Sequence, residues 1–178
     1  MVVFVSWSAP ISHKIAQALC EWLSELNPSW ETYISDEIEA GSFWFEELTD
    51  SLKKAHAAIL CMTRENLQSP WLLFEAGALC IGSDVPVIPV LFRLESSELE
   101  KSPLHYFQSV ELSKSGIWNL TRKLNRICGD ELSTEDMRKK FENTYPKLEE
   151  KISAINVPPE WDQMEHITGK YYLSPATQ

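Results

Sequence analysis

Motifs that define several large enzyme classes are missing from this 178-residue sequence. It contains neither G-x-G-x-x-G nor G-x-x-x-x-G-K-[ST], which argues against a dehydrogenase-type dinucleotide fold and against a P-loop nucleotide site. The absence of G-x-S-x-G leaves a serine hydrolase without support. The four cysteines and four histidines show no spacing typical of zinc ligands, so we expect no metal site.

Positive charge is also scarce, with 16 Lys and Arg residues against 26 Asp and Glu residues and a net charge of −10. Duplex nucleic acid is bound by clustered cations that displace counterions, so neither nucleic acid nor an anionic membrane is an expected partner. No apolar run approaches the roughly 20 residues of a membrane span, and the run at 1–5 is too short for a signal peptide. Scattered cysteines without C-x-x-C predict reduced, buried thiols. We therefore expect a cytoplasmic protein.

What the sequence does contain is a regular alternation of strand and helix patterns. Short apolar runs predict strands at 2–5, 30–34, 57–62 and 85–92, and an alternating run predicts an edge strand within 107–112. Apolar residues at helical spacing predict helices that begin near residues 10, 44, 70, 115 and 134. Strands and helices in alternation, joined by short loops, indicate βαβ units, a parallel sheet and an α/β fold.

Three local signals refine this prediction. Ser8 is placed to cap the first helix. Pro86 and Pro89 remove two backbone donors, which predicts that the fourth strand is irregular or lies at a sheet edge. Pro146 falls inside the last helical pattern, so we expect a kink or break near Thr144.

The stretch 69–78 carries the chemistry around which the rest is organised. Pro70 favours the first turn of a helix, on which Trp71 and Glu75 lie one turn apart on the same face. The apolar residues 72–74 point elsewhere and would anchor the helix. Ligands of open parallel sheets bind beyond the carboxyl ends of the strands, and this stretch follows the third expected strand. It therefore falls on the ligand-binding edge.

An aromatic ring beside a carboxylate suits NAD+ as a ligand. A cationic ring over an aromatic face gains ~0.5–2 kcal/mol, which favours stacking of nicotinamide on Trp71. Cleavage of the nicotinamide–ribose bond leaves an oxocarbenium-like ribose, which the single carboxylate of Glu75 could bind and stabilise. NAD+ would then be the substrate, and no cofactor is expected. The structural alternatives are a satisfied carboxylate at Glu75 and a core-packed indole at Trp71.

Two further groups of residues could complete such a site. Asp36, Phe43 and Trp44 lie in an acidic segment that is interpreted as a mobile lid or assembly loop, with an aromatic closing over the ligand. The alternative for this segment is a solvated acidic loop. A phosphate has room at the helix N-terminus beside three small residues at the end of the first expected strand, Ser6, Ser8 and Ala9.

Three stretches, in order, resemble the conserved boxes of Toll/interleukin-1 receptor (TIR) domains. Residues 4–8 (Phe-Val-Ser-Trp-Ser) resemble the first box, residues 35–44 resemble the BB loop, and residues 69–78 resemble the catalytic helix of bacterial TIR proteins. The resemblance implies a flavodoxin-like, three-layer fold with about five parallel strands and helices on both faces of the sheet. In enzymatic members it implies NAD+ glycohydrolysis, with the catalytic glutamate at Glu75 and the nearby aromatic at Trp71. The family's other NAD+ pocket positions fall on Ser8, Ala9, Asp36, Phe43 and Trp44.

The resemblance also implies a biological setting. Bacterial relatives act in antiphage immunity, where they deplete NAD+ or make a cyclic ADP-ribose-type signal for a separate effector, and TIR domains self-associate. The basic residues that often follow the first box in animal enzymes are absent after Ser8, so backbone N–H groups would hold the phosphates or the product would differ. We expect a TIR domain at 1–155 and an irregular tail at 156–178, in a stand-alone enzyme. A non-catalytic TIR adaptor and a nucleoside deoxyribosyltransferase-like enzyme are the alternatives.

Overall fold

The computed structural model describes residues 1–34, 54–82, 85–100, 102–129 and 132–161. The described residues form a five-stranded, all-parallel sheet with the strand order β2-β1-β3-β4-β5. Its strands are β1 (Val2–Ser6), β2 (Glu31–Ile34), β3 (Ala57–Met62), β4 (Val87–Leu91) and β5 (Val110–Glu111). The helices are α1 (Pro10–Leu26), α3 (Pro70–Gly82), α4 (Lys114–Ile127) and α5 (Thr134–Ser153), with short 3-10 helices η1 (Ser96–Leu99) and η2 (Pro103–Tyr106). The helix expected near residue 44 lies mostly outside the described residues.

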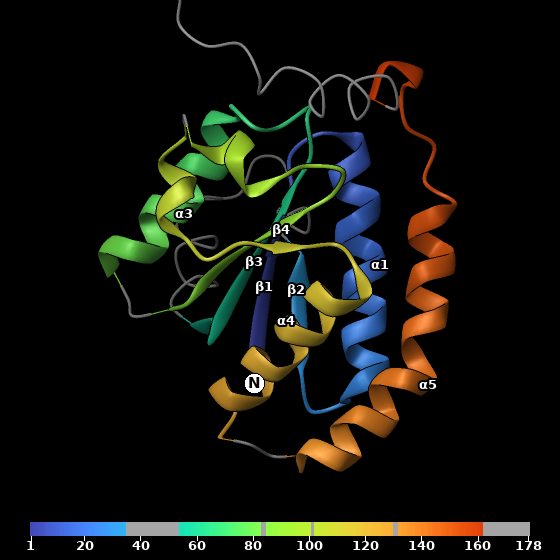
Figure 1. Cartoon of the computed structure of the whole chain (residues 1–178). Helices are drawn as coiled ribbons and strands as arrows, with labels where there is room; N and C mark the ends of the chain where they lie inside the picture. Colours follow the sequence, from blue (N-terminus) through green and yellow to red (C-terminus); the bar gives the residue numbers. More distant parts are fainter. Residues whose placement is uncertain (35–53, 83–84, 101, 130–131, 162–178) are drawn as a thin grey trace, which may run out of the picture.

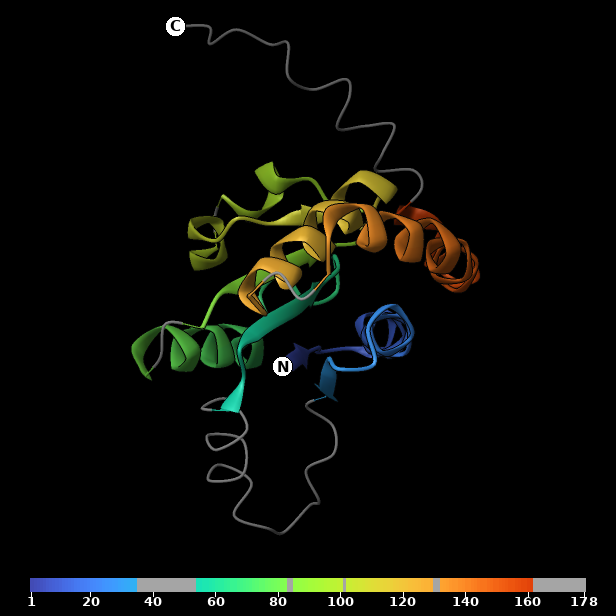
Figure 2. The ribbon, with the colours of Figure 1, turned by 90° about the horizontal axis from the view of Figure 1, so that it is seen from below.

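Helices cover both faces of the sheet, which confirms the predicted three-layer α/β architecture (Figures 1 and 2). Figure 2 shows α3, in green, on one side of the strands and α1 and α5, in blue and orange, on the other. The strand order is that of flavodoxin-like folds, in which the crevice between β1 and β3 is the expected ligand position. The fold therefore directs attention to the carboxyl ends of these two strands.

The central strand β3 explains why the sheet is buried on both sides. All six of its residues are buried. Ala57, Ile59 and Cys61 enter the core beneath α1, α4 and α5, whereas the alternate residues of β3 enter the core beneath α3. A strand covered on both faces needs a continuous apolar sequence rather than an alternating one, as the sequence of β3 shows.

The fourth strand corrects the prediction that its prolines would make it irregular or peripheral. β4 lies between β3 and β5, and all of its residues are buried. The carbonyl of Pro86 accepts a hydrogen bond from β3, and that of Leu91 accepts one from the residue after β5. Because backbone groups alternate in direction along a strand, Pro89 is oriented like Leu91, toward β5, which pairs with β4 over only two residues. The missing N–H of Pro89 therefore removes nothing from the β3–β4 ladder.

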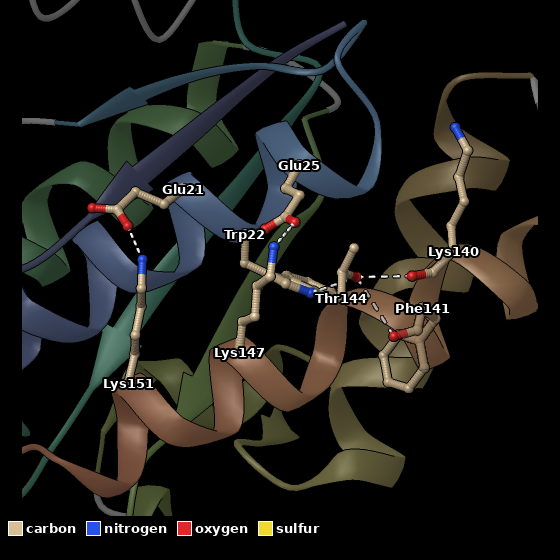
Figure 3. A network of polar contacts seen from close by, with 8 residues as sticks. All are labelled: Glu21, Trp22, Glu25, Lys140, Phe141, Thr144, Lys147 and Lys151. Carbon is tan, nitrogen blue, oxygen red and sulfur yellow. Dashed lines mark hydrogen bonds and ion pairs between the residues drawn. The ribbon is translucent and has the colours of Figure 1, made fainter.

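Helix α5 packs along α1 and closes one face of the domain (Figures 1 and 3). The Trp22 indole on α1 donates a 3.0 Å hydrogen bond to Oγ1 of Thr144 on α5, and two ion pairs flank the contact, Lys147 with Glu25 and Lys151 with Glu21. Helix α5 runs through Pro146 as one element, so of the kink or break expected near Thr144 the break does not occur. Beyond it, the Trp161 side chain is only 6% exposed and belongs to the same core.

Candidate functional site

The candidate site lies where β1 and β3 end and where α1 and α3 begin. Ser6 is the last residue of β1, and the loop at 7–9 leads directly into α1. The loop at 63–69 connects β3 to α3, and its end lies beside the first loop, because Oγ of Ser69 donates a 2.9 Å hydrogen bond to Oγ of Ser8. The topology thus brings Ser8 and Ser69, which are 61 residues apart in sequence, into contact at the ligand-facing edge of the sheet.

Helix α3 is held in place by a clamp in the β3–α3 loop. The buried side chain of Asn66 accepts a hydrogen bond from the Thr63 amide and donates one to the Cys61 carbonyl, both at 2.8 Å. Pro70 begins the helix, as predicted, and Leu72 is completely buried against the sheet. Phe74, which was expected to anchor the helix, is instead 41% exposed. The face of α3 that packs against the sheet is therefore narrower than the apolar sequence of this helix suggested.

Glu75 points into the protein rather than onto an open helix face. Its side chain has no exposed surface, and its Oε2 accepts a hydrogen bond from the hydroxyl of Ser6. Within the described part of the chain, the other carboxylate oxygen, Oε1, is buried and has no hydrogen-bond partner. A buried acceptor without a partner is costly, at about 1–3 kcal/mol, and such a group calls for an explanation.

The surroundings of Glu75 change its acidity. Burial raises the pKa of its carboxyl from 4.5 to about 7, because desolvation penalises the charged form, and hydrogen bonds from Ser6 and the Trp71 side chain counteract only part of this effect. Trp71 is partly exposed and also packs on the core beneath α3. The Trp71 side chain therefore extends from the buried carboxylate to the protein surface. Its packing agrees with the structural interpretation, and stacking on nicotinamide stays a prediction.

The loop after β1 contains a strained residue. Ala9 precedes α1 with φ 92° and ψ 154°, a combination that is almost restricted to glycine and costs of order 1–3 kcal/mol. Ala9, not Ser8, occupies the N-cap position, so the predicted Ser8 cap is wrong. The hydroxyl of Ser12 holds this loop instead, accepting from the Ser8 amide at 3.1 Å and donating to the Ser8 and Ala9 carbonyls at 2.7 and 2.9 Å. Strain of this kind is typical of functional sites.

The structure thus gathers four of the seven residues proposed for the site. Ser8 and Ala9 on one loop meet the start of the helix that carries Trp71 and Glu75. The other three, Asp36, Phe43 and Trp44, lie outside the described residues. Sequence reasoning missed the direct contact of Ser6 with Glu75, although a serine ending an otherwise apolar strand was the available signal.

Two further findings describe what the chain contains. The described residues include no group of three or more His, Cys, Asp or Glu side chains that could hold a metal ion. Of the helices that could be assessed, none combines the length and apolarity needed to cross a bilayer. Among the described residues, Cys20, Cys61 and Cys128 form no disulfide. The first two are buried, as predicted, whereas Cys128 is only partly buried.

Comparison with known proteins identifies the family. No curated protein matches the chain. Among solved structures, an azoreductase from Bacillus anthracis strain Sterne is similar with a TM-score of 0.40 and 11% identity, over 85% of this chain and 98% of that one; a similarity this weak carries no argument about activity. Residues 3–128, well over half of the chain, match the model of the TIR domain family. Together with the parallel sheet in flavodoxin-like order, this match means that the chain belongs to the TIR domain family.

Proposed function

We propose that this TIR domain cleaves the nicotinamide–ribose bond of NAD+ and that Glu75 is its catalytic residue. The observation that carries the proposal is the environment of Glu75 at the β1–β3 crevice. Its carboxylate is desolvated, is oriented by Ser6 through Oε2, and retains an oxygen, Oε1, without a partner among the described residues. A ribose hydroxyl is a donor that would satisfy this oxygen.

The chemistry required of the carboxylate is limited. The bond between ribose C1′ and the pyridinium nitrogen breaks with its electron pair, which leaves neutral nicotinamide and an oxocarbenium-like ribose. A negative charge fixed in a low-dielectric site stabilises that cation far better than one in water. Water, or a nucleophilic atom elsewhere in the ADP-ribosyl group, then attacks C1′ and loses a proton, which gives linear or cyclic ADP-ribose respectively.

Substrate must displace protein groups to reach Glu75, because the carboxylate is enclosed. The partly exposed Trp71 side chain hydrogen bonds to Glu75, so its rotation would open a path from the surface. The freed indole face would then be available to stack on the nicotinamide ring. Ser8, Ala9 and the start of α1 would face the diphosphate, in keeping with anion binding at a helix N-terminus.

The test is release of nicotinamide from NAD+, measured by chromatography over a series of protein concentrations. We expect Glu75→Gln to lower the rate by about 100-fold or more, the loss typical of removing one transition-state-stabilising group. Glu65→Gln, an exposed carboxylate in the preceding loop, is the matched control and should retain parental activity. Equal rates for Glu75→Gln and the parent would exclude the mechanism.

A second function, that of a non-catalytic TIR adaptor, is favoured by one observation. In the structure, Ser6 and Trp71 close off the acid on which catalysis would depend. An adaptor would release no nicotinamide at any concentration, and its binding to partner TIR domains would survive Glu75→Gln. The enzymatic function is preferred because a purely structural carboxylate would be expected to have both oxygens satisfied.

The setting that we propose is bacterial antiphage defence in the cytoplasm, in which the protein self-associates through TIR–TIR contacts. The product tells whether the protein depletes NAD+ or makes a signal. Mass spectrometry distinguishes linear, cyclic and conjugated ADP-ribose. If assembly completes the site, specific activity should rise steeply with protein concentration. A constant specific activity would indicate that each chain contains the whole site.

A further inference from the structure

A basic cleft lies between the edge strand β5, two positions from β3 in the sheet, and the helix α4 that follows it. Its volume is about 480 Å³, within the range of small-molecule sites. Its lining consists of Gln108, Ser109, Val110, Asn119, Arg122, Lys123 and Arg126. Three of these seven residues are cations and none is an acid, although the chain as a whole has a net charge of −10.

Helical spacing creates this concentration of charge. Asn119 and Lys123 are four residues apart on α4, as are Arg122 and Arg126, so both pairs project from neighbouring positions on one side of the helix. The buried residues of α4, including Leu120 and Leu124, face the core. The cationic side therefore borders the buried side, and β5 forms the opposite wall of the cleft.

The cations of the cleft differ from four lysines of α4 and α5 that have an acidic partner. Lys114, Lys139, Lys147 and Lys151 on α4 and α5 each form an ion pair with a glutamate. Arg122, Lys123 and Arg126 form no ion pair or hydrogen bond with any residue that the structure describes. Partial burial also lowers the pKa of Lys123 through desolvation. A desolvated cation without a counter-ion gains more from an anionic ligand than a solvated one does.

We propose that this cleft binds a compact anion that carries two or more phosphate groups. Two guanidinium forks bind phosphate oxygens in a bidentate manner, and the amides of Gln108 and Asn119 add donors. The lining contains no aromatic side chain on which a nucleobase could stack, so phosphate groups rather than a base supply the recognition.

The charge of the remaining protein selects for a compact ligand. Electrostatic interactions are screened beyond about 8–10 Å at physiological salt, so a small anion in the cleft is attracted mainly by the three nearby cations. An extended polyanion would also meet the rest of a chain whose net charge is −10. Glu111, the acid of β5, follows Val110 and so projects from the other face of the strand. The negative end of α4, worth about half a charge, is outweighed by the three cations.

Isothermal titration calorimetry with inorganic pyrophosphate and with tripolyphosphate tests this proposal on the intact chain. We expect binding at one site per chain that weakens strongly between about 0.1 M and about 1 M salt, where the screening length falls from roughly 10 to 3 Å. Arg122→Gln combined with Arg126→Gln should weaken binding by at least about tenfold. Arg138→Gln combined with Lys140→Gln on α5 removes the same charge elsewhere and should leave affinity unchanged.

Several results would overturn the proposal. These are no binding by the parent, equal weakening in the two double variants, or binding of only single-stranded RNA or phosphatidylglycerol vesicles. Lys123→Gln provides a second variant. Its affinity for pyrophosphate should also fall, because the lysine lines the cleft. Glu75→Gln should bind pyrophosphate as the parent does, which separates this cleft from the proposed NAD+ site. Loss of pyrophosphate binding in Glu75→Gln would assign the binding to that site instead.

Discussion

Replacing Glu75 with glutamine should change how the stability of the protein depends on pH. The folded carboxyl has a pKa of about 7, against an ordinary value of 4.5. Between these values the folded state keeps a proton that the unfolded state releases, so raising the pH favours unfolding. One pH unit corresponds to roughly 1.4 kcal/mol. The free energy of unfolding should therefore be about 3 kcal/mol lower above pH 7 than in acidic solution, because of Glu75 alone.

Glutamine cannot ionise, so the variant should lack this loss. Urea unfolding at 25 °C, at about pH 5, 6, 7 and 8, gives the free energy of unfolding of parent and variant at each pH. The stability of the variant minus that of the parent should increase by about 2–3 kcal/mol from pH 5 to pH 8. For a chain of this size, that increase corresponds to a relative melting shift of roughly 4–12 °C.

The comparison across pH removes effects that do not depend on ionisation. The glutamine amide places new donors in a buried position, and their cost is the same at every pH, so it cancels in the difference. Glu65→Gln, an exposed carboxylate, should follow the parent within about 0.5 kcal/mol throughout. Parallel stability curves for the Glu75→Gln variant and the parent would refute the reasoning, because they would mean that the acid is not desolvated in the native state.

Three other substitutions test the described packing by equilibrium urea unfolding. Ala9→Gly should stabilise the protein by about 1 kcal/mol, because relief of the positive φ exceeds the entropy cost of glycine; a destabilised variant would contradict the strain. Gly116→Ala should destabilise by about 1–3 kcal/mol despite the better helix propensity of alanine, since the added Cβ would lie 2.0 Å from the Glu111 carbonyl oxygen; an unchanged midpoint would show that α4 can move away from β5. Thr144→Val should cost about 1–3 kcal/mol by leaving the Trp22 indole N–H buried without its acceptor; a neutral effect would mean that another group replaces the hydroxyl.

The sequence predicted the architecture well because the sheet is built from simple patterns. Residues 57–62 are uniformly apolar, and both faces of this strand are indeed covered. The prediction for β4 was wrong because a proline removes a ladder hydrogen bond only where its N–H would have faced a paired strand. That direction is a property of strand order and register, which no local pattern records.

The candidate site was predicted less completely, for a different physical reason. Helical spacing correctly placed Trp71 and Glu75 one turn apart, but it could not tell which side of α3 faces the sheet, since nearly every residue of this helix is apolar or small. The interior orientation of Glu75 depends on Ser6, which lies sixty-nine residues away in sequence. Contacts of this range follow from topology, so they became visible only in the folded chain.

The packing of α5 along α1 has a consequence for where the domain can be cut. The match to the family ends at residue 128, yet Trp22 finds both its hydrogen-bond acceptor and the ring of Phe141 on a helix that begins six residues later. A fragment truncated at the family boundary would expose the Trp22 indole to water and leave its N–H without this acceptor. The family match therefore marks where sequence similarity stops, whereas the packed core extends to Trp161.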